Sequence, residues 1–260
     1  MKKTFYYLLL LFISLVIQSC KENNIEPPLI YPPDDFFPNV IGSWYSYSTQ
    51  ISDSSGLILT GSRSQYFNNQ VILEGTTYQS ETDTFTLDRS TEISQSYFRK
   101  SESGVFYYAD TSGIWFTVPD LLKQYLNFDR EYRLLFIPLS INQNWPVYRV
   151  EFNYNGFRFY VINSYADIIS KDTLNLNLNS LNLKVVSYKI KFTLKMQLSP
   201  SSQPIIYEAD GWTVNNIGFV KWEGDSEVFN FICRTNIFPS GSTAKMDLTN
   251  YNIPALLNSN

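Results

Sequence analysis

Strict alternation of apolar and polar residues over residues 186–198 is the feature that most constrains the fold of this chain. The apolar positions are Val186, Tyr188, Ile190, Phe192, Leu194, Met196 and Leu198. The residues between them include Lys189, Lys191 and Lys195. Successive side chains of a β-strand point to opposite faces, so a period of two places one face in a core and the other in solvent. The segment predicts a long strand that is apolar on one side and basic on the other.

The segment just before it alternates as well, but in a different phase. Leucines stand at 174, 176 and 178, and then at 181 and 183. A shift of one residue moves the side chains of a strand to its other face. We therefore expect a turn or bulge near Asn179-Ser180.

A second local signal predicts a β-hairpin around Asn155-Gly156. Apolar and polar residues alternate over 148–154 and again over 157–161. Asn-Gly between two such runs is typical of a type I′ turn, whose two central residues both need a positive φ. This register would pair Tyr154 with Phe157, Phe152 with Phe159, and Val150 with Val161.

Further short strands are predicted between turn residues such as Glu74-Gly75 and Ser103-Gly104. They are Trp44–Gln50, Ser64–Leu73, Thr82–Arg89, Ser94–Lys100, Val105–Ala109, Ile114–Val118, Ile205–Ala209, Gly218–Trp222 and Glu227–Thr235. One helix is predicted, over Pro119–Phe128, because apolar residues recur on one side of it. With 19 Tyr and 19 Phe, which suit half-buried strands, the chain is expected to be all-β or β-rich.

Composition excludes several kinds of function. The chain has no histidine, which removes Ser-His-Asp triads, Cys-His pairs and histidine metal sites. No basic stripe suited to nucleic acid is present, and no phosphate loop or CxxC motif. We expect no cofactor, no metal, no nucleic-acid partner and no catalytic residue, so the chain is not expected to be an enzyme.

The N-terminus has the three parts of a secretory signal. Lys2 and Lys3 are followed by an apolar run from Phe5 to Ile17, and a small residue, Ser19, precedes Cys20. A run of about 13 residues is short for a spanning helix, which needs roughly 20. The segment Ile17–Cys20 resembles the lipobox of bacterial lipoproteins, although Gln18 is unusual at its position.

That resemblance implies that Cys20 is lipidated after cleavage and carries acyl chains such as palmitate. We then expect a signal peptide at 1–19, a lipidated Cys20 with a proline-rich tether at 20–35, and an antiparallel β domain at 36–260. The membrane would be a partner through the anchor at Cys20, since two or more acyl chains anchor a protein stably. The expected location is the bacterial cell envelope, at the outer membrane, on its periplasmic face or at the cell surface.

Only one cysteine remains in the mature chain if Cys20 is lipidated. That cysteine is Cys233, and without a second free cysteine no intramolecular disulfide can form. Cys233 lies in the apolar stretch 229–233. We expect a buried, unreactive thiol.

A proline–tryptophan pattern occurs twice in the chain. Phe37-Pro38 precedes Gly42, Trp44 and Tyr47, and the second occurrence and a glycine-rich close lie further on. These later positions are Phe136, Pro138, Trp145 and Tyr148, then Gly211-Trp212 and Ile217-Gly218-Phe219-Val220-Lys221. Pro can fix the entry to a strand, Gly can permit a turn and Trp can fill a core, which is the interpretation we favour over ligand contact.

The pattern resembles uncharacterised lipoproteins of the Bacteroidetes and Chlorobi, which share an FP…G..W.Y opening and a GxGxVK-like close. Asn216 and Gln143 depart from it, because glycine is common at both positions. The resemblance implies a single strongly curved antiparallel sheet, like the β-clam or half-barrel of lipoprotein carriers, with at most one or two short helices. It implies no catalytic residues.

Three kinds of function fit these expectations. The first is a non-enzymatic binding or envelope-assembly protein, whose partner is an apolar ligand between the faces of the sheet or an envelope protein. The second is a cell-surface module for glycan or protein, which an exposed Trp beside carboxylates would support. The third, a hydrolase that uses carboxylates alone, would need two facing acids in a cleft. The candidate acids for that role are Asp34 with Asp35, and Glu81 with Asp83 and Asp88. Asp34 and Asp35 are expected to be solvated loop charges, and nothing marks Glu81, Asp83 and Asp88 as an acid–base pair.

Overall fold

The computed structural model describes residues 34–109, 123–178 and 181–254, all of which belong to one compact unit, Asp34–Asn260. Cys20, the signal peptide, most of the tether, the predicted strand Ile114–Val118 and the predicted turn at Asn179-Ser180 lie outside the described residues. The described strands are β1 Trp44–Ser52, β2 Ile58–Leu73, β3 Thr76–Leu87, β4 Ser90–Ser101, β5 Gly104–Tyr108, β6 Leu126–Phe128, β7 Glu131–Phe136, β8 Asn144–Tyr154, β9 Phe157–Leu178, β10 Leu181–Met196, β11 Ile205–Val214, β12 Gly218–Asp225 and β13 Thr243–Asn252. One helix, α3 Ser226–Cys233, lies between β12 and β13.

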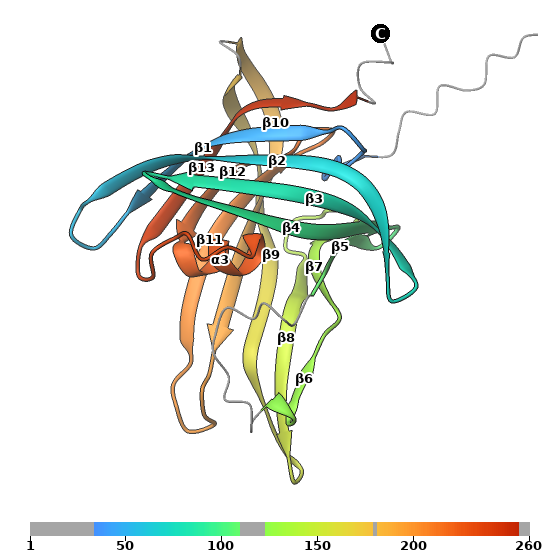
Figure 1. Cartoon of the computed structure of the whole chain (residues 1–260), viewed down its shortest axis with the longest axis vertical. Coiled ribbons are helices and arrows are strands. Elements are labelled where there is room, and N and C mark those ends of the chain that lie inside the picture. The colour runs from blue at the N-terminus through green and yellow to red at the C-terminus, as the bar shows by residue number, and fades with distance from the viewer. Residues whose placement is uncertain (1–33, 110–122, 179–180, 255–260) are drawn as a thin grey trace, which may run out of the picture. The chain divides into compact units, whose positions relative to one another are not determined.

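All these strands form one antiparallel sheet in the order β6-β8-β9-β10-β11-β12-β13-β1-β2-β3-β4-β5-β7. The sheet curves so strongly that β1–β4 cross in front of β8–β12 (Figure 1). Edge strand β7 thereby reaches β8, where the indole nitrogen of Trp145 donates a 3.0 Å hydrogen bond to the carbonyl of Arg133. The predicted fold, a single strongly curved antiparallel sheet that remains open, is confirmed.

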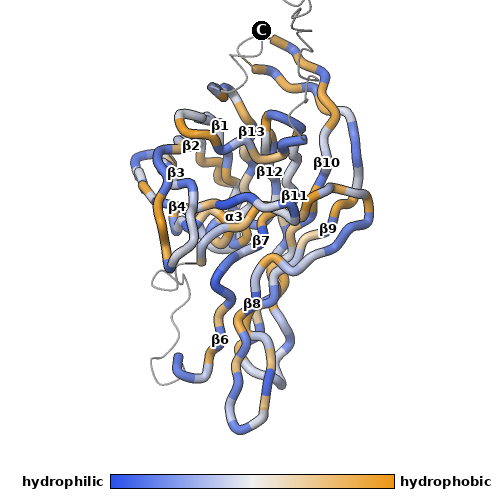
Figure 2. The backbone as a smooth tube through the Cα atoms, turned by 90° about the vertical axis from the view of Figure 1, so that its right-hand side faces the viewer, coloured by the Kyte–Doolittle hydropathy of each residue, from blue (hydrophilic) through white to orange (hydrophobic). Residues whose placement is uncertain are grey.

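Hydropathy alternates along the strands (Figure 2), and the inward positions fill the space that the curved sheet encloses. On β10, the side chains of Ile190, Phe192 and Leu194 are fully buried, as the alternation over 186–198 predicts. Helix α3 packs inside the curve and buries Phe229 and Phe231. Layering a helix inside a folded-over sheet lets both halves of the sheet bury one common core.

Helix α3 corrects the prediction of a strand over Glu227–Thr235. The helix runs from Ser226 to Cys233 and ends at Arg234, whose backbone is left-handed with φ of 51°. A short apolar run does not distinguish a buried helix from a buried strand, because both bury almost every side chain. Strand β12 ends at Asp225, directly before the helix, and the chain then turns inward to fill the core.

The helix predicted over Pro119–Phe128 ends earlier than predicted in the part that the structure describes, because Lys123 is helical, Gln124 and Tyr125 form a turn, and a strand follows. Leu126–Phe128 forms β6 and pairs with Val150–Phe152 of β8. A short edge strand beside a longer one carries too few residues for its own period to show. Strands β7 and β13 were not predicted, although Ala244, Met246 and Leu248 of β13 do alternate.

The hairpin at Asn155-Gly156 is confirmed at its turn and wrong further along. Asn155 and Gly156 have positive φ values of 50° and 80°, and Tyr154 pairs with Phe157 and Phe152 with Phe159. Beyond Glu151 the register shifts, so Val150 pairs with Ile162 instead of Val161. A bulge of this kind adds one residue to one strand and increases the local twist.

Candidate functional site

A cluster of polar and charged side chains lies inside the curved sheet, between β2 and β3. Arg63 and Gln65 of β2 and Glu81 and Asp83 of β3 point inward, and all four are buried. Residues two apart on a strand share a face, and the register places Gln65 opposite Asp83. The Arg63 guanidinium donates from Nε to Asp83 Oδ1 over 3.0 Å and from Nη2 to Oδ2 over 2.6 Å. Such a two-pronged pair suits a buried charge, because both carboxylate oxygens gain a partner.

Glu81 is the acid of this cluster that forms no ion pair among the described residues. Burial, and next the negative charge of Asp83, raise the pKa of Glu81 to about 8 from its usual 4.5. The Gln65 side-chain amide donates a hydrogen bond to Glu81. Burial also raises the pKa of Asp83, and the Arg63 guanidinium opposes that rise. Glu81 therefore keeps its proton at neutral pH.

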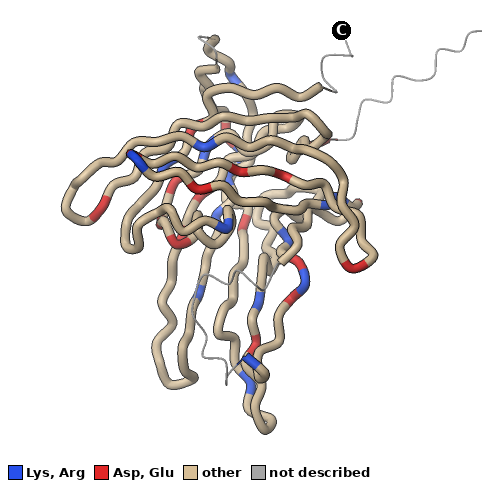
Figure 3. Tube along the Cα trace, in the orientation of Figure 1, with Lys and Arg blue, Asp and Glu red and all other residues tan. Residues whose placement is uncertain are grey.

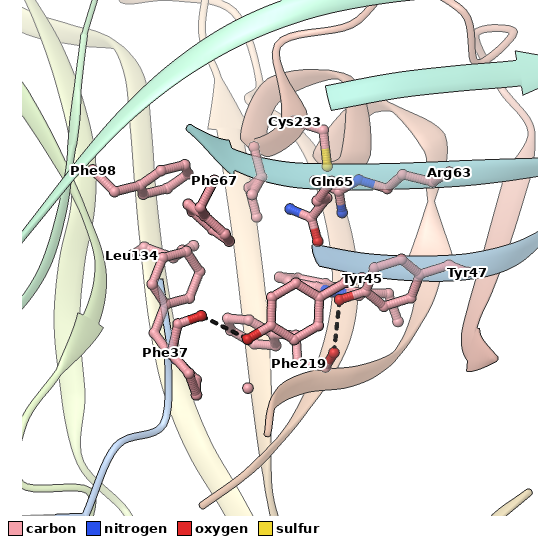
Figure 4. A pocket seen from close by; sticks show the side chains of 14 residues that line it. Phe37, Tyr45, Tyr47, Arg63, Gln65, Phe67, Phe98, Leu134, Phe219 and Cys233 are labelled. Carbon is pink, nitrogen blue, oxygen red and sulfur yellow. Dashed lines mark hydrogen bonds between the residues drawn. The ribbon is translucent and has the colours of Figure 1, made fainter. Parts of the chain in front are cut away.

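A cavity of about 40 Å³ lies beside the cluster, at the centre of the molecule (Figure 4). Aromatic side chains make up half of its lining, and two of them donate hydrogen bonds to backbone carbonyls. The Tyr45 hydroxyl donates to the carbonyl of Pro38 over 2.6 Å, and the Tyr47 hydroxyl donates to that of Phe219 over 2.9 Å. Ligand pockets usually measure about 300–1,000 Å³. This cavity has room for a water molecule or two, and it has no room for an acyl chain or a sugar.

Two of the motifs singled out in the sequence, the opening pattern and the Gly218-Phe219 part of the close, meet at this cavity. Phe37, Pro38 and Tyr47 from the opening pattern line it together with Gly218 and Phe219 from the close. In the second pattern, Trp145 is 1% exposed and links β8 to β7. Each of these residues fills space or fixes a turn, so the structural interpretation holds for this part of the motifs.

Cys233 also borders the cavity and is buried, as predicted. Burial raises the pKa of its thiol to about 12, so the thiolate needed for reaction is scarce at neutral pH. Among the described residues, no group of three or more His, Cys, Asp or Glu side chains could hold a metal ion. No helix in the described parts of the chain is long and apolar enough to cross a membrane.

The outward face of β10–β13 carries ion pairs, which we call the outer ladder. Its pairs are Lys189–Asp210 at 2.8 Å, Lys191–Glu208 at 3.2 Å, Lys221–Glu223 at 2.8 Å and Lys245–Asp247 at 2.9 Å. Figure 3 shows basic and acidic residues intermingled along the strands. The face predicted to be basic is therefore neutralised by acids of the neighbouring strand, and Lys195 lies over the ring of Tyr165.

A groove of about 470 Å³, which we call the outer groove, lies along β10–β12 of this face. Trp212 is half-buried at its side, between the ammonium groups of Lys189 and Lys221, which lie 5.0 and 4.4 Å from the ring. Gly224 forms part of the groove, and a Cβ there would lie 2.4 Å from Ala209 Cα. Any other residue at 224 would collide with β11, so the depression depends on this glycine.

The outer groove is acidic. Its lining carries two basic residues, Lys189 and Lys191, against four acidic ones, Glu208, Asp210, Glu223 and Asp225. Asp210 binds Lys189 through Oδ2, whereas its Oδ1 is buried without a hydrogen-bond partner among the described residues.

The acids weighed from the sequence do not form a catalytic pair in a cleft. Glu81 and Asp83 do share a face, but it is the filled interior. Asp88 lies in a turn with φ of 52°. Asp35 pairs with Lys100 at 2.7 Å, and Asp34 accepts a hydrogen bond from Asn215.

The fold and surface define a curved open-sheet protein with a filled core and a polar outer groove. No family model matches the chain, and no curated protein matches it. Solved structures that are similar include a protein of Parabacteroides distasonis described as a lipoprotein, with 13% identity, a TM-score of 0.47, and coverage of 84% of this chain and 99% of that one. An exported protein with a YmcC-like fold from Bacteroides fragilis has 16% identity, a TM-score of 0.47 and the same coverage.

The hypothetical lipoprotein YmcC of Escherichia coli is similar as well, with 9% identity and a TM-score of 0.31, over 78% of this chain and 83% of that one. Likeness at these values says nothing about a ligand or a reaction.

Proposed function

We propose that this chain is a lipid-anchored protein of the bacterial cell envelope that binds a glycan through its outer groove and catalyses no reaction. The anchor follows from the signal-like start and the lipobox-like Ile17–Cys20. The binding site follows from the contrast between a filled interior and a polar groove on the surface.

The half-buried Trp212 beside the carboxylates of Asp210 and Glu223 in the outer groove carries the proposal. Sugars present hydroxyl groups that both donate and accept hydrogen bonds, together with apolar C–H surfaces. The outer groove offers acceptors on Asp210 and Glu223, donors on Lys189 and Lys191, and an indole edge between them. Its volume of about 470 Å³ is within the usual range for ligand pockets, whereas the central cavity is not.

A glycan-binding experiment with matched variants tests this site. The purified protein is titrated with envelope polysaccharide and with peptidoglycan fragments, and binding is followed by calorimetry. Trp212→Ala and Asp210→Asn should each weaken binding at least about tenfold, since a lost buried hydrogen bond to a charged group costs about 1.5–3 kcal/mol. Asp247→Asn, a ladder residue outside the groove, is the control and should bind normally. Equal binding by the Asp210 and Asp247 variants, or no binding of any glycan, would reject the site.

The anchor has its own test. Cells that express the full chain are grown with labelled palmitate, and the protein is isolated and its label measured. The wild-type chain should carry label, and Cys20→Ser should carry none. Label that survives in the Cys20→Ser variant would show that Cys20 is not the lipidated residue.

A further inference from the structure

The far end of the β8–β9 hairpin carries a group of exposed aromatic rings, which we call the aromatic tip. Its members are Tyr125, Phe152, Tyr154, Phe157, Phe159 and Tyr160. Tyr154, Phe157 and Tyr160 remain 45%, 49% and 42% exposed. Five of these rings, all except Tyr160, contact one another, with 4.7 Å between the centroids of Tyr125 and Tyr154 and 5.4 Å between those of Phe152 and Phe159. A packed ring cluster that is left half-exposed is typical of a surface that meets an apolar partner.

The basic residues of the tip differ from those of the outer ladder. Arg149 and Arg158 are exposed, and no ion pair among the described residues includes either of them. The Arg149 guanidinium lies 5.5 Å from the ring centroid of Tyr160. Glu151, the acid of this hairpin, accepts a hydrogen bond from Asn127 instead. The tip therefore presents two exposed arginines on a chain whose net charge is −4, and Arg149 is close enough to Asp129 to oppose the rise that burial causes in the pKa of that carboxyl.

Aromatic rings next to exposed arginines suit one environment in particular. Tyrosine rings gather at the boundary between lipid headgroups and acyl chains, where one end of the ring is apolar and the other is wet. Basic side chains next to the membrane are attracted to anionic headgroups. The narrow two-stranded end of the hairpin can enter that layer with its backbone paired across the turn.

We propose that the aromatic tip inserts into the headgroup region of a bilayer that contains anionic lipid, as a second attachment point. This inference rests on the lipid anchoring proposed above, which keeps a bilayer within reach. Strand β9 has 22 residues, which corresponds to roughly 70 Å if it were straight. Figure 1 shows the tip at the lower end of the long axis, remote from the blue start of the described chain.

A single spin label at the turn tests the insertion. Asn155→Cys is labelled with a nitroxide in the full acylated protein, in which Cys20 is blocked by lipid and Cys233 is buried. The protein is reconstituted in vesicles of phosphatidylcholine alone, or of equal parts phosphatidylcholine and phosphatidylglycerol. The quantity measured is the accessibility of the label to oxygen relative to its accessibility to a water-soluble nickel complex. In the anionic vesicles this ratio should be several-fold higher for the label at Asn155→Cys than for a control label at Ser55→Cys. It should also be higher in the anionic vesicles than in phosphatidylcholine alone.

Two variants separate the contributions at the tip. Arg149→Gln with Arg158→Gln should remove the difference between the two vesicle types, and Tyr154→Ser with Phe157→Ser should return the label to water. A label that stays aqueous in both kinds of vesicle would overturn the proposal and assign the tip to a protein partner. Failure of the anchor is a separate result, because the mass of the unacylated protein would show no lipid.

Discussion

The inner and outer faces of the same sheet both carry ion pairs, but in very different surroundings. Inside, Arg63 and Asp83 hold each other through two hydrogen bonds, and their side chains are 7% and 2% exposed. Outside, Lys245 and Asp247 of the outer ladder lie 2.9 Å apart with each side chain 43% exposed. One protein therefore contains similar ion pairs in a buried core and at the solvent-exposed surface.

The comparison shows that the environment of an ion pair matters more than its distance. Water screens an exposed pair, so its contribution to the free energy of unfolding is small. A buried pair has lost its hydration, and each partner depends on the other to offset that cost. Removing one partner of the buried pair should therefore lower the free energy of unfolding far more than removing one partner of an exposed pair.

Arg63→Met should have the largest effect. The change leaves the Asp83 carboxylate buried without its partner, which is expected to cost about 3–5 kcal/mol in the free energy of unfolding. Urea denaturation followed by tryptophan fluorescence measures this loss. The double variant Arg63→Met with Asp83→Leu removes both charges and should recover most of it. A double variant as unstable as the single one would show that the pair contributes more than mutual charge compensation.

Glu81→Gln should raise stability, and more so at higher pH. The pKa of Glu81 is about 8 in the folded protein and near 4.5 in the unfolded chain. Between these values the folded state holds a proton that the unfolded state has lost, so wild-type stability falls as pH rises from about 4.5 to 8. The glutamine of the variant does not titrate, so the variant escapes this loss. A gain of about 1–2 kcal/mol in the free energy of unfolding would raise its Tm by roughly 2–8 °C at pH 8.

The gain from Glu81→Gln should shrink towards pH 5, where both states of the wild type hold the proton more equally. Glu102→Gln, at an exposed turn, is the control and should change the Tm little at either pH. A gain that does not vary with pH would show that Glu81 does not titrate in this window.

Lys245→Met should have the smallest effect. Its partner Asp247 stays hydrated, so the expected loss is below about 1 kcal/mol and should vanish in high salt. The same urea titration as for Arg63→Met measures it. A loss as large as that of Arg63→Met would contradict the comparison between the two faces.

The sequence predicted the strands well because their alternation is a local property. The period over 186–198 and the Asn155-Gly156 turn needed no knowledge of distant residues, and both were found. Helix α3 and the shift of Val150 from Val161 to Ile162 were missed, since each depends on how the chain packs against other strands. Periodicity cannot report such tertiary decisions.

The buried cluster did leave a signal in the sequence. Glu81 and Asp83 stand in phase with Phe85 and Leu87, and the outward positions between them are threonines. Charges in phase with the apolar face of a strand indicate buried ion pairs. The outer groove left none, because Gly224 meets Ala209 and Trp212 meets Lys221 only when β11 and β12 pair.

The order of the strands has a consequence for how the protein is made. Strands β1–β5 and β8–β12 each build up by pairing neighbours along the chain, but β1 finds its second partner only in β13, the last strand. Chain synthesis and export proceed from the N-terminus, so the joining strand is the final one to emerge. Until then the edges of β1 and β12 both stay open, which favours slow folding and unwanted pairing with other chains. A chain cut short before Thr243 would thus lose the seam that unites the two halves of its sheet.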